Sequence, residues 1–448
     1  MMGERVVMQE SLFYQFRLED HVPDHLLRRI DRFVDLSALR THLEPFYSSI
    51  GRPSIDPELM IRMLIVGYCS GIRSERRLCE EVHLNLGYRW FCRLGLEGRV
   101  PDHSTFSKNR HGRFAESDVF RHLFETVVER CIAEGLVGGE GFAVDASLIE
   151  ADANRQRGVP GPEWRPPEAA SHSVREYMAV LDEAVWGRAT DVVPKFVSPA
   201  DPAAQWTGAM RGPAFFAYAD NYLIDLRTAV IVDVEPSRAV RQAEVGAARR
   251  MIERTAERFG LKPQRLAGDT AYGSAEMLNW LVEEMQIAPH IPVIDKSGRR
   301  DGTFAREEFR YDETTDIYIC PGGKPLTTTG TLVNEGATLL YRASTADCGR
   351  CQLKAQCCPN TPVRKVPRSL YERARDLTRS LAGTPAFERS RRERKRVEML
   401  FAHLKRILRL GRLRLRGPCG ARDEFLLAAT AQNLRKLAKL IPQPAAAI

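Results

Sequence analysis

The sequence predicts a mixed α/β protein that begins with an all-α domain. Residues 1–137 carry helix-start signals and helical spacing of apolar residues, whereas residues 138–295 alternate between apolar strands and helices. Residues 296–388 alternate like short strands and contain several cysteines, and residues 389–448 return to helical spacing. We therefore expect a helical N-terminal domain, an α/β domain, a cysteine-containing β subdomain inserted into it, and a C-terminal helical part that completes the α/β domain.

The composition is that of a folded protein in a reducing compartment. The chain has 448 residues, of which 44% are hydrophobic, so it can bury a sizeable core. No stretch approaches the roughly 18 apolar residues of a membrane span, and ten cysteines in this length are not a disulfide scaffold. We expect a cytoplasmic protein with reduced thiols and no membrane partner.

The positive charge is concentrated near the C-terminus. Residues 389–416 contain 12 Lys or Arg and two Glu, a net charge of +10 in a chain whose total is +8. Such a local surplus favours an anionic partner, nucleic acid above all. A solvated basic helix is the simpler alternative.

This basic stretch is predicted to be helical, with one late interruption at Gly411. At 100° per residue its apolar residues form one stripe, and a neighbouring face holds one acid among three cations. The stripe consists of Val397, Leu400, Phe401, Leu404 and Leu408, and the neighbouring face of Arg391, Arg394, Glu398 and Lys405. A single carboxylate is therefore expected at the edge of a buried surface.

The N-terminal domain shows several helix starts. Residues 56–58 (Asp-Pro-Glu) supply a cap, a first-turn proline and a first-turn acid, and Ser74 and Ser117 are expected to cap two further helices. The stretch 101–114 is polar and basic. Short helices followed by a polar, basic one are typical of helix-turn-helix readers of DNA. A plain helical bundle with solvated charges is the alternative.

The α/β domain opens with an apolar strand that carries a carboxylate, Asp145, in its middle. Apolar residues on both faces predict cover on both sides, and a charge there needs a partner or a metal. A Pro-rich insertion at 153–214 follows, with one helix expected over 173–186. The later elements are predicted at 215–224 (strand), 228–237 (strand), 238–260 (helix), 265–269 (strand), 275–285 (helix) and 288–294 (strand).

Three acids lie at distinct points in this order of elements. Asp145 lies on the first strand, Asp269 ends the fourth main strand, and Glu398 lies on a later helix. An RNase H-like sheet has this layout, and its acidic residues converge on one edge to hold divalent cations.

Three blocks give the chain a resemblance to DDE transposases of bacterial insertion sequences. They are FAVDASLIEADAN with Asp145, GDTAYGS with Asp269, and an Arg-x3-Glu-x6-Lys signature met by Arg394, Glu398 and Lys405. One departure is visible, because members usually have Tyr where this chain has Arg391. The resemblance implies a helical N-terminal DNA-binding domain (1–137) and an RNase H-like catalytic domain split by an insertion.

The resemblance also implies a chemistry. Asp145, Asp269 and Glu398 would hold two Mg²⁺ or Mn²⁺ ions for in-line phosphoryl transfer, since carboxylate oxygens suit these ions. Arg394, Lys405 and Arg391 would contact phosphates. The implied partner is double-stranded DNA, namely the terminal inverted repeats of an element and a target site, with the protein acting as a homodimer on DNA.

The cysteines of the insertion suggest a second metal. Cys320, Cys348, Cys351 and Cys357, with Cys358 as the alternative fourth ligand, would make a tetrahedral structural Zn²⁺ site. Reduced thiols beside a loop are the other interpretation.

Three functional classes remain open at this stage. The first is a transposase that cleaves and joins DNA strands. The second is an RNase H-like nuclease without strand transfer, and the third is a catalytically inactive, transposase-derived DNA-binding protein. The three acids together with Arg394 and Lys405 favour an enzyme.

Overall fold

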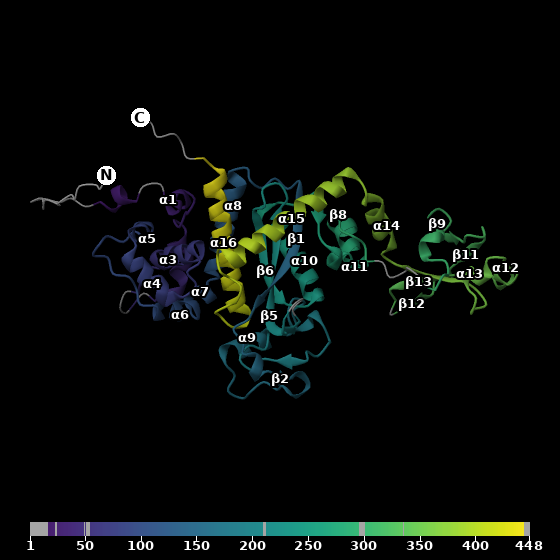
Figure 1. Ribbon diagram of the computed structural model, residues 1–448, viewed down its shortest axis with the longest axis horizontal. Helices are drawn as coiled ribbons and strands as arrows, with labels where there is room; N and C mark the ends of the chain where they lie inside the picture. The colour runs from purple at the N-terminus through teal and green to yellow at the C-terminus, as the bar shows by residue number, and fades with distance from the viewer. Residues whose placement is uncertain are drawn as a thin grey trace, which may run out of the picture.

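The computed structural model describes residues 17–22, 25–48, 50, 54–208, 212–294, 301–334 and 336–442. Its N-terminal part is helical and its remainder is mixed α/β (Figure 1). The N-terminal helices are α1 (Leu26–Asp31), α2 (Leu39–Leu43), α3 (Pro57–Ser70), α4 (Glu75–Leu84), α5 (Leu86–Phe91), α6 (Ser104–Arg110), α7 (Arg113–Glu116) and α8 (Val119–Ala133). Within the described residues, no helix is long and apolar enough to cross a membrane.

Two of the three predicted helix caps are present, and the third is not. Asp56 accepts a hydrogen bond from the Glu58 N–H at the start of α3, and Ser74 caps α4 in the same way. The prediction that Ser117 caps α8 is wrong. Ser117 instead ends α7, and α8 begins after Asp118, whose backbone is left-handed (φ 50°) and whose side chain caps nothing.

The central sheet has six strands and is mixed in direction. The strands are β1 (Gly141–Glu150), β4 (Gln205–Thr207), β5 (Phe215–Asp225), β6 (Ile231–Arg238), β7 (Arg265–Ala267) and β8 (Ala288–His290). β5 lies between β1 and β6 and is antiparallel to both, while β7 is parallel to β1 and β8 is parallel to β7. The strand order across the sheet is therefore β6-β5-β1-β7-β8, with β4 pairing with the first residues of β5.

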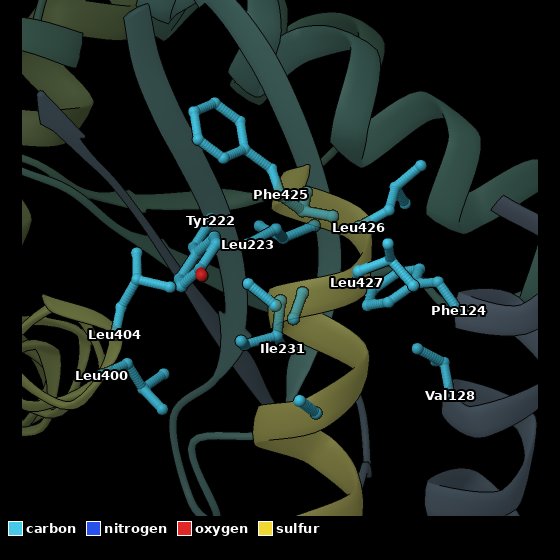
Figure 2. Close-up of a cluster of buried hydrophobic side chains, with 14 of the residues drawn as sticks. Phe124, Val128, Tyr222, Leu223, Ile231, Leu400, Leu404, Phe425, Leu426 and Leu427 are labelled. Atoms are coloured by element: carbon cyan, nitrogen blue, oxygen red, sulfur yellow. The ribbon is translucent and has the colours of Figure 1, made fainter. Parts of the chain in front are cut away.

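Helices cover this sheet as its apolar strands require. They are α10 (Arg241–Phe259), α11 (Ala275–Asn279), which continues as a π-helical turn η7 (Trp280–Glu284), α15 (Pro385–Arg406) and α16 (Gly417–Leu440). Figure 2 shows Leu400 and Leu404 of α15 near Tyr222 of β5, and the Tyr222 ring stacks on Phe401 at a centroid distance of 4.7 Å. The stripe predicted for the basic helix is buried throughout.

The basic helix is shorter at its C-terminal end than expected. It begins at Pro385, where Thr384 caps it, and ends at Arg406 rather than continuing to residue 416. Arg409 adopts a left-handed backbone (φ 56°). The chain then extends along the end of β1, where the Leu413 N–H donates to the Glu150 carbonyl at 2.7 Å. Burial of apolar residues in this segment anchors it as an extended strap instead of a helix.

The Pro-rich insertion contains less helix than expected. Its helix α9 (His172–Ala179) stops well before residue 186. The other elements described there are short 3-10 turns, the strands β2 (Val159–Pro160) and β3 (Phe196–Val197), and β4 of the central sheet. The final helix, α16, is longer than the tail helix that its apolar spacing indicates, because Gly417-Pro418 opens it instead of preceding it. α16 packs against α8, α3 and β6, joining the N-terminal helices to the sheet.

A second sheet lies between β8 and α15 in the chain. Its strands are β9 (Arg310–Asp312), β10 (Ile317–Ile319), β11 (Pro325–Thr327), β12 (Leu332–Val333), β13 (Thr338–Ala343) and β14 (Lys365–Ser369). It is accompanied by the short helices α12 (Thr345–Gly349) and α13 (Lys354–Cys357), and α14 (Glu372–Leu381) leads back to the main domain. This sheet has its own small core and lies at the opposite end of the molecule from the N-terminal helices (Figure 1).

Candidate active site

Strand register brings the first two acids of the sequence prediction to the same level of the sheet. Ala143 of β1 pairs with Ala267 of the parallel strand β7. Asp145 and Asp269 each follow these alanines by two residues. Since adjacent strands lie roughly 4.8 Å apart, equal steps along parallel neighbours keep the two acids side by side.

Asp145 is held between the sheet and α15. Its Oδ1 accepts a hydrogen bond from the Ala146 N–H at 2.9 Å, and its Oδ2 accepts one from Arg394 Nη1 of α15, also at 2.9 Å. Burial raises the pKa of this carboxyl, and the Ala146 hydrogen bond and the Arg394 charge oppose that rise. The charges of Asp269 and Glu398 raise the same pKa, so all three predicted acids share one electrostatic environment.

Asp269 turns the chain sharply after β7. Its Oδ1 accepts a hydrogen bond from the Ala271 N–H at 2.7 Å, which caps the 3-10 turn η6 (Thr270–Tyr272). The hydroxyl of Tyr272 in this turn is buried, and no hydrogen-bond partner for it exists among the described residues. A buried polar atom without a partner beside carboxylates is the environment of a site that takes up water or an ion.

The third acid, Glu398, comes from α15, which packs against β1 and β7. It lies one helical turn after Arg394 and is exposed. Arg394, one turn earlier on the same helix, links α15 to Asp145 on the sheet.

The other two predicted phosphate-contacting residues lie at the surface of α15. Arg391 is exposed and pairs with Glu388 at 3.1 Å. Lys405 is also exposed; burial lowers the pKa of its ammonium, and the charge of Asp220 opposes the change. Asp220 is fully buried on β5, and neither of its carboxyl oxygens has a hydrogen-bond partner within the described chain.

A fourth carboxylate, Glu244, was missed by the sequence reasoning. It lies in the first turn of α10, and one turn earlier Arg241 donates hydrogen bonds to the carbonyls of Thr270 and Ala271 in the turn that Asp269 caps. Burial, together with the charges of Asp269 and Asp145, raises the pKa of Glu244 to about 7. A first-turn glutamate is ordinary in a helix, so nothing in the sequence distinguishes Glu244 from other acids at helix starts.

The donor set fits hydrated Mg²⁺ or Mn²⁺. Mg²⁺ keeps several waters and takes one or two carboxylates from a protein, and each singly hydrogen-bonded carboxylate oxygen retains a further lone pair. In the described part of the chain, no three His, Cys, Asp or Glu side chains enclose a metal position by themselves. The ion-free arrangement instead neutralises Asp145 through Arg394.

The cysteines of the second sheet gather near one glycine turn. The Cys320 sulfur accepts a hydrogen bond from the Lys324 N–H at 3.3 Å. A Cβ placed on Gly322 would lie 3.6 Å from the Cys351 sulfur and 3.7 Å from the Cys320 sulfur. Cys348, Cys357 and Cys358 are buried in the same small core, where burial raises the pKa of Cys357 to about 11.

Comparison with protein families gives two matches. Residues 16–112, which include helices α1 to α6, match a family described as Transposase domain (DUF772). Residues 319–438 match a family described as Transposase DDE domain. The second match includes Arg394, Glu398 and Lys405 and the cysteines from Cys320 to Cys358, whereas Asp145 and Asp269 lie outside both.

Proposed function

We propose that this chain, which belongs to the DDE transposases of insertion sequences, binds the ends of a mobile element and catalyses metal-dependent DNA strand cleavage and strand transfer. The observation that carries the proposal is the Ala143–Ala267 register, which brings Asp145 on β1 and Asp269, two residues past the end of the pairing, to the same level of the sheet. The strand order and directions support an RNase H-like catalytic domain.

Asp145, Asp269 and Glu398 are the proposed ligands of Mg²⁺ or Mn²⁺. When bound, two such ions activate the attacking oxygen and stabilise the leaving oxygen of an in-line displacement at phosphorus. When ionised, Glu244 adds a fourth negative charge near Asp145 and Asp269 and so increases the demand for cations there.

Arg394 has two roles in this proposal. In the ion-free protein it fixes the Asp145 carboxylate through its 2.9 Å hydrogen bond. Near DNA it offers its remaining N–H donors to the phosphate that reacts or to its neighbour. Lys405 and Arg391, exposed on the same helix, would contact flanking phosphates.

The N-terminal helices are the proposed reader of the element ends. α4 and α6 are short helices with exposed basic residues, namely Arg76 and Arg77 on α4 and Lys108 on α6. Pairing of two ends on one complex calls for a homodimer on DNA. The match of this region to a transposase domain supports its part in the same reaction.

A structural Zn²⁺ held by Cys320, Cys348, Cys351 and either Cys357 or Cys358 is a separate proposal. The Lys324 N–H donates to the Cys320 sulfur at 3.3 Å, which orients that side chain at the glycine turn. Cys320 and Cys351 both lie beside Gly322, where a Cβ would be 3.7 and 3.6 Å from their sulfur atoms. Metal analysis of the purified protein should find about one zinc per chain, and Cys351→Ser should lose it whereas Cys419→Ser, outside the cluster, should keep it.

Excision from a reporter plasmid tests the main proposal. The native locus with its flanks is cloned on the plasmid, and the wild type or Asp269→Asn is supplied in trans. Excision by the wild type and none by the variant is the expected result. A wild type that binds the locus ends but never excises them would favour the inactive DNA-binding class, and cleavage without joining would favour the nuclease.

A further inference from the structure

A cavity of about 630 Å³ opens between α1, α15, α16 and the turn that joins β5 to β6. Its charged and titratable lining residues are Arg29, Arg396, His403, Arg435, Lys436 and Lys439. No Asp or Glu is among the described residues that line it. We call it the cationic cavity.

Another large cavity shows that this imbalance is unusual in the protein. That cavity, near residues 70–88 and 409–414, also contains several arginines, but Glu81 and Asp152 line it as well. There Arg77 pairs with Glu81 and Arg412 with Asp152, each at 3.1 Å. Its arginines are therefore at least partly neutralised from within, whereas the lining of the cationic cavity contains no acid that could do so.

Backbone carbonyls hold the cations of the cationic cavity in place. Arg396 donates to the carbonyls of residues 226 and 227, and Lys436 donates to those of residues 228 and 229 at 2.6 and 2.9 Å. Arg435 donates to the Cys69 carbonyl at 2.8 Å. A carbonyl orients a cation without neutralising it, so the positive charge persists in the cavity.

The electrostatics of the lining agree with this geometry. Burial, together with the neighbouring charges of Lys439 and Arg396, lowers the pKa of Lys436 to about 8, and the charge of Asp225 opposes the change. Burial and the charges of Arg435 and Lys436 lower the pKa of His403. The dipole of α16 favours cations such as Lys436 and Lys439 near its C-terminal end, whereas Arg396 comes from α15 and brings its charge to the cavity from another helix.

We propose that the cationic cavity binds backbone phosphates of a DNA duplex, on a side of α15 different from the one that carries Arg394 and Glu398. Successive phosphates along a strand suit cations spread over three helices better than a single small anion does. The choice of DNA rests on the proposed function, while the capture of phosphate oxygens rests only on the lining. The β5–β6 turn bonded to Arg396 and Lys436 would couple this contact to the strand that neighbours Asp145.

Salt-dependent binding of the full-length protein to a random-sequence duplex tests the proposal. EDTA is present throughout, so binding is measured apart from catalysis. Lys439 is exposed, and Lys439→Gln should reduce the slope of log K against log salt by about 1. Lys262→Gln, which removes an equally exposed charge in the loop after α10, is the matched control and should leave the slope as it is.

Two further variants serve as controls for the duplex-binding experiment. Lys439→Arg should retain the wild-type slope, and Asp269→Asn should retain it even if the catalytic proposal fails. An unchanged slope for Lys439→Gln in a protein with normal thermal unfolding would overturn the proposal. A second result would also overturn it: inorganic phosphate or a mononucleotide stabilises the protein, but Lys439→Gln does not change duplex binding. The cavity would then hold a free phosphate compound and not DNA.

Discussion

Replacement of Glu244 by Gln tests whether this carboxyl is buried beside the other acids of the proposed active site. The substitution keeps the shape of the side chain and removes its charge. In the folded protein the pKa of this carboxyl is raised to about 7 from an ordinary value of 4.5. At about 1.4 kcal/mol per pKa unit, the ionised form costs about 3 kcal/mol of folding stability.

The sign of the pH dependence follows from proton binding. Between pH 4.5 and about 7 the folded state holds a proton on Glu244 that the unfolded state has lost, so the stability of the wild type falls across this window as pH rises. Without metal, Glu244→Gln should therefore be more stable than the wild type by up to about 3 kcal/mol at pH 8 and by little at pH 4.5.

Urea unfolding in EDTA at the two pH values measures this difference. Added Mg²⁺ should stabilise the wild type more than the variant, because the variant has lost one of the four charges that attract the ion. Equal stability of the two proteins at pH 8, or an advantage that is the same at both pH values, would refute the idea that Glu244 is held against the other carboxylates.

Three further predictions concern the helix that completes the site, the core beneath it and a buried acid of the insertion. Arg394→Gln should slow strand cleavage by about 10- to 100-fold, since a charge-assisted hydrogen bond contributes about 1.5–3 kcal/mol, whereas the rate with Arg392→Gln, at an exposed position beside it, should stay close to wild type. Leu404→Ala should lower the free energy of unfolding by about 2–5 kcal/mol, because Leu404 is fully buried. Met399→Ala is its control, because that side chain is 71% exposed. Equal effects of the two substitutions would contradict the packing described. Burial raises the pKa of Asp201 to about 7, so thermal stability should fall as pH rises from 4 to 7 and should fall less in Asp201→Asn.

Much of the fold could be predicted because its signals are local. Capping residues placed the starts of α3 and α4, and the apolar stripe from Val397 to Leu408 identified the buried face of α15 correctly. The strands and helices from β5 to β8 also follow the predicted order. Such signals require only neighbours in sequence or one helical turn.

The errors arise where distant contacts decide the outcome. The basic segment after Arg406 has helical composition, yet pairing of residues 411–413 with the end of β1 and burial of Leu413 make it an extended strap. Ser117 is a good capping residue, but it ends one helix instead of starting the next. Tertiary packing overrides local propensity in both places.

In the candidate site, too, the residues in local motifs could be predicted and those placed by distant contacts could not. Asp145, Asp269 and Glu398 could be proposed from sequence because they stand in recognisable blocks. Their common environment depends on strand register and on the position of α15, and the importance of Glu244 appears only when α10 is seen beside η6. The sequence alone could not show this because the acid belongs to no motif.

Strand joining by purified protein is the most direct test of the central claim, that Asp145, Asp269 and Glu398 form one metal-dependent centre. The substrate is a DNA fragment with the ends of the native locus, and a supercoiled plasmid serves as target. With Mg²⁺ or Mn²⁺ the wild type should cut the ends and join them to the plasmid, and Asp145→Asn, Asp269→Asn and Glu398→Gln should each reduce both steps to background while still binding the ends in EDTA. Joining that persists in any of the three variants, or that proceeds in the wild type in EDTA, would contradict the account.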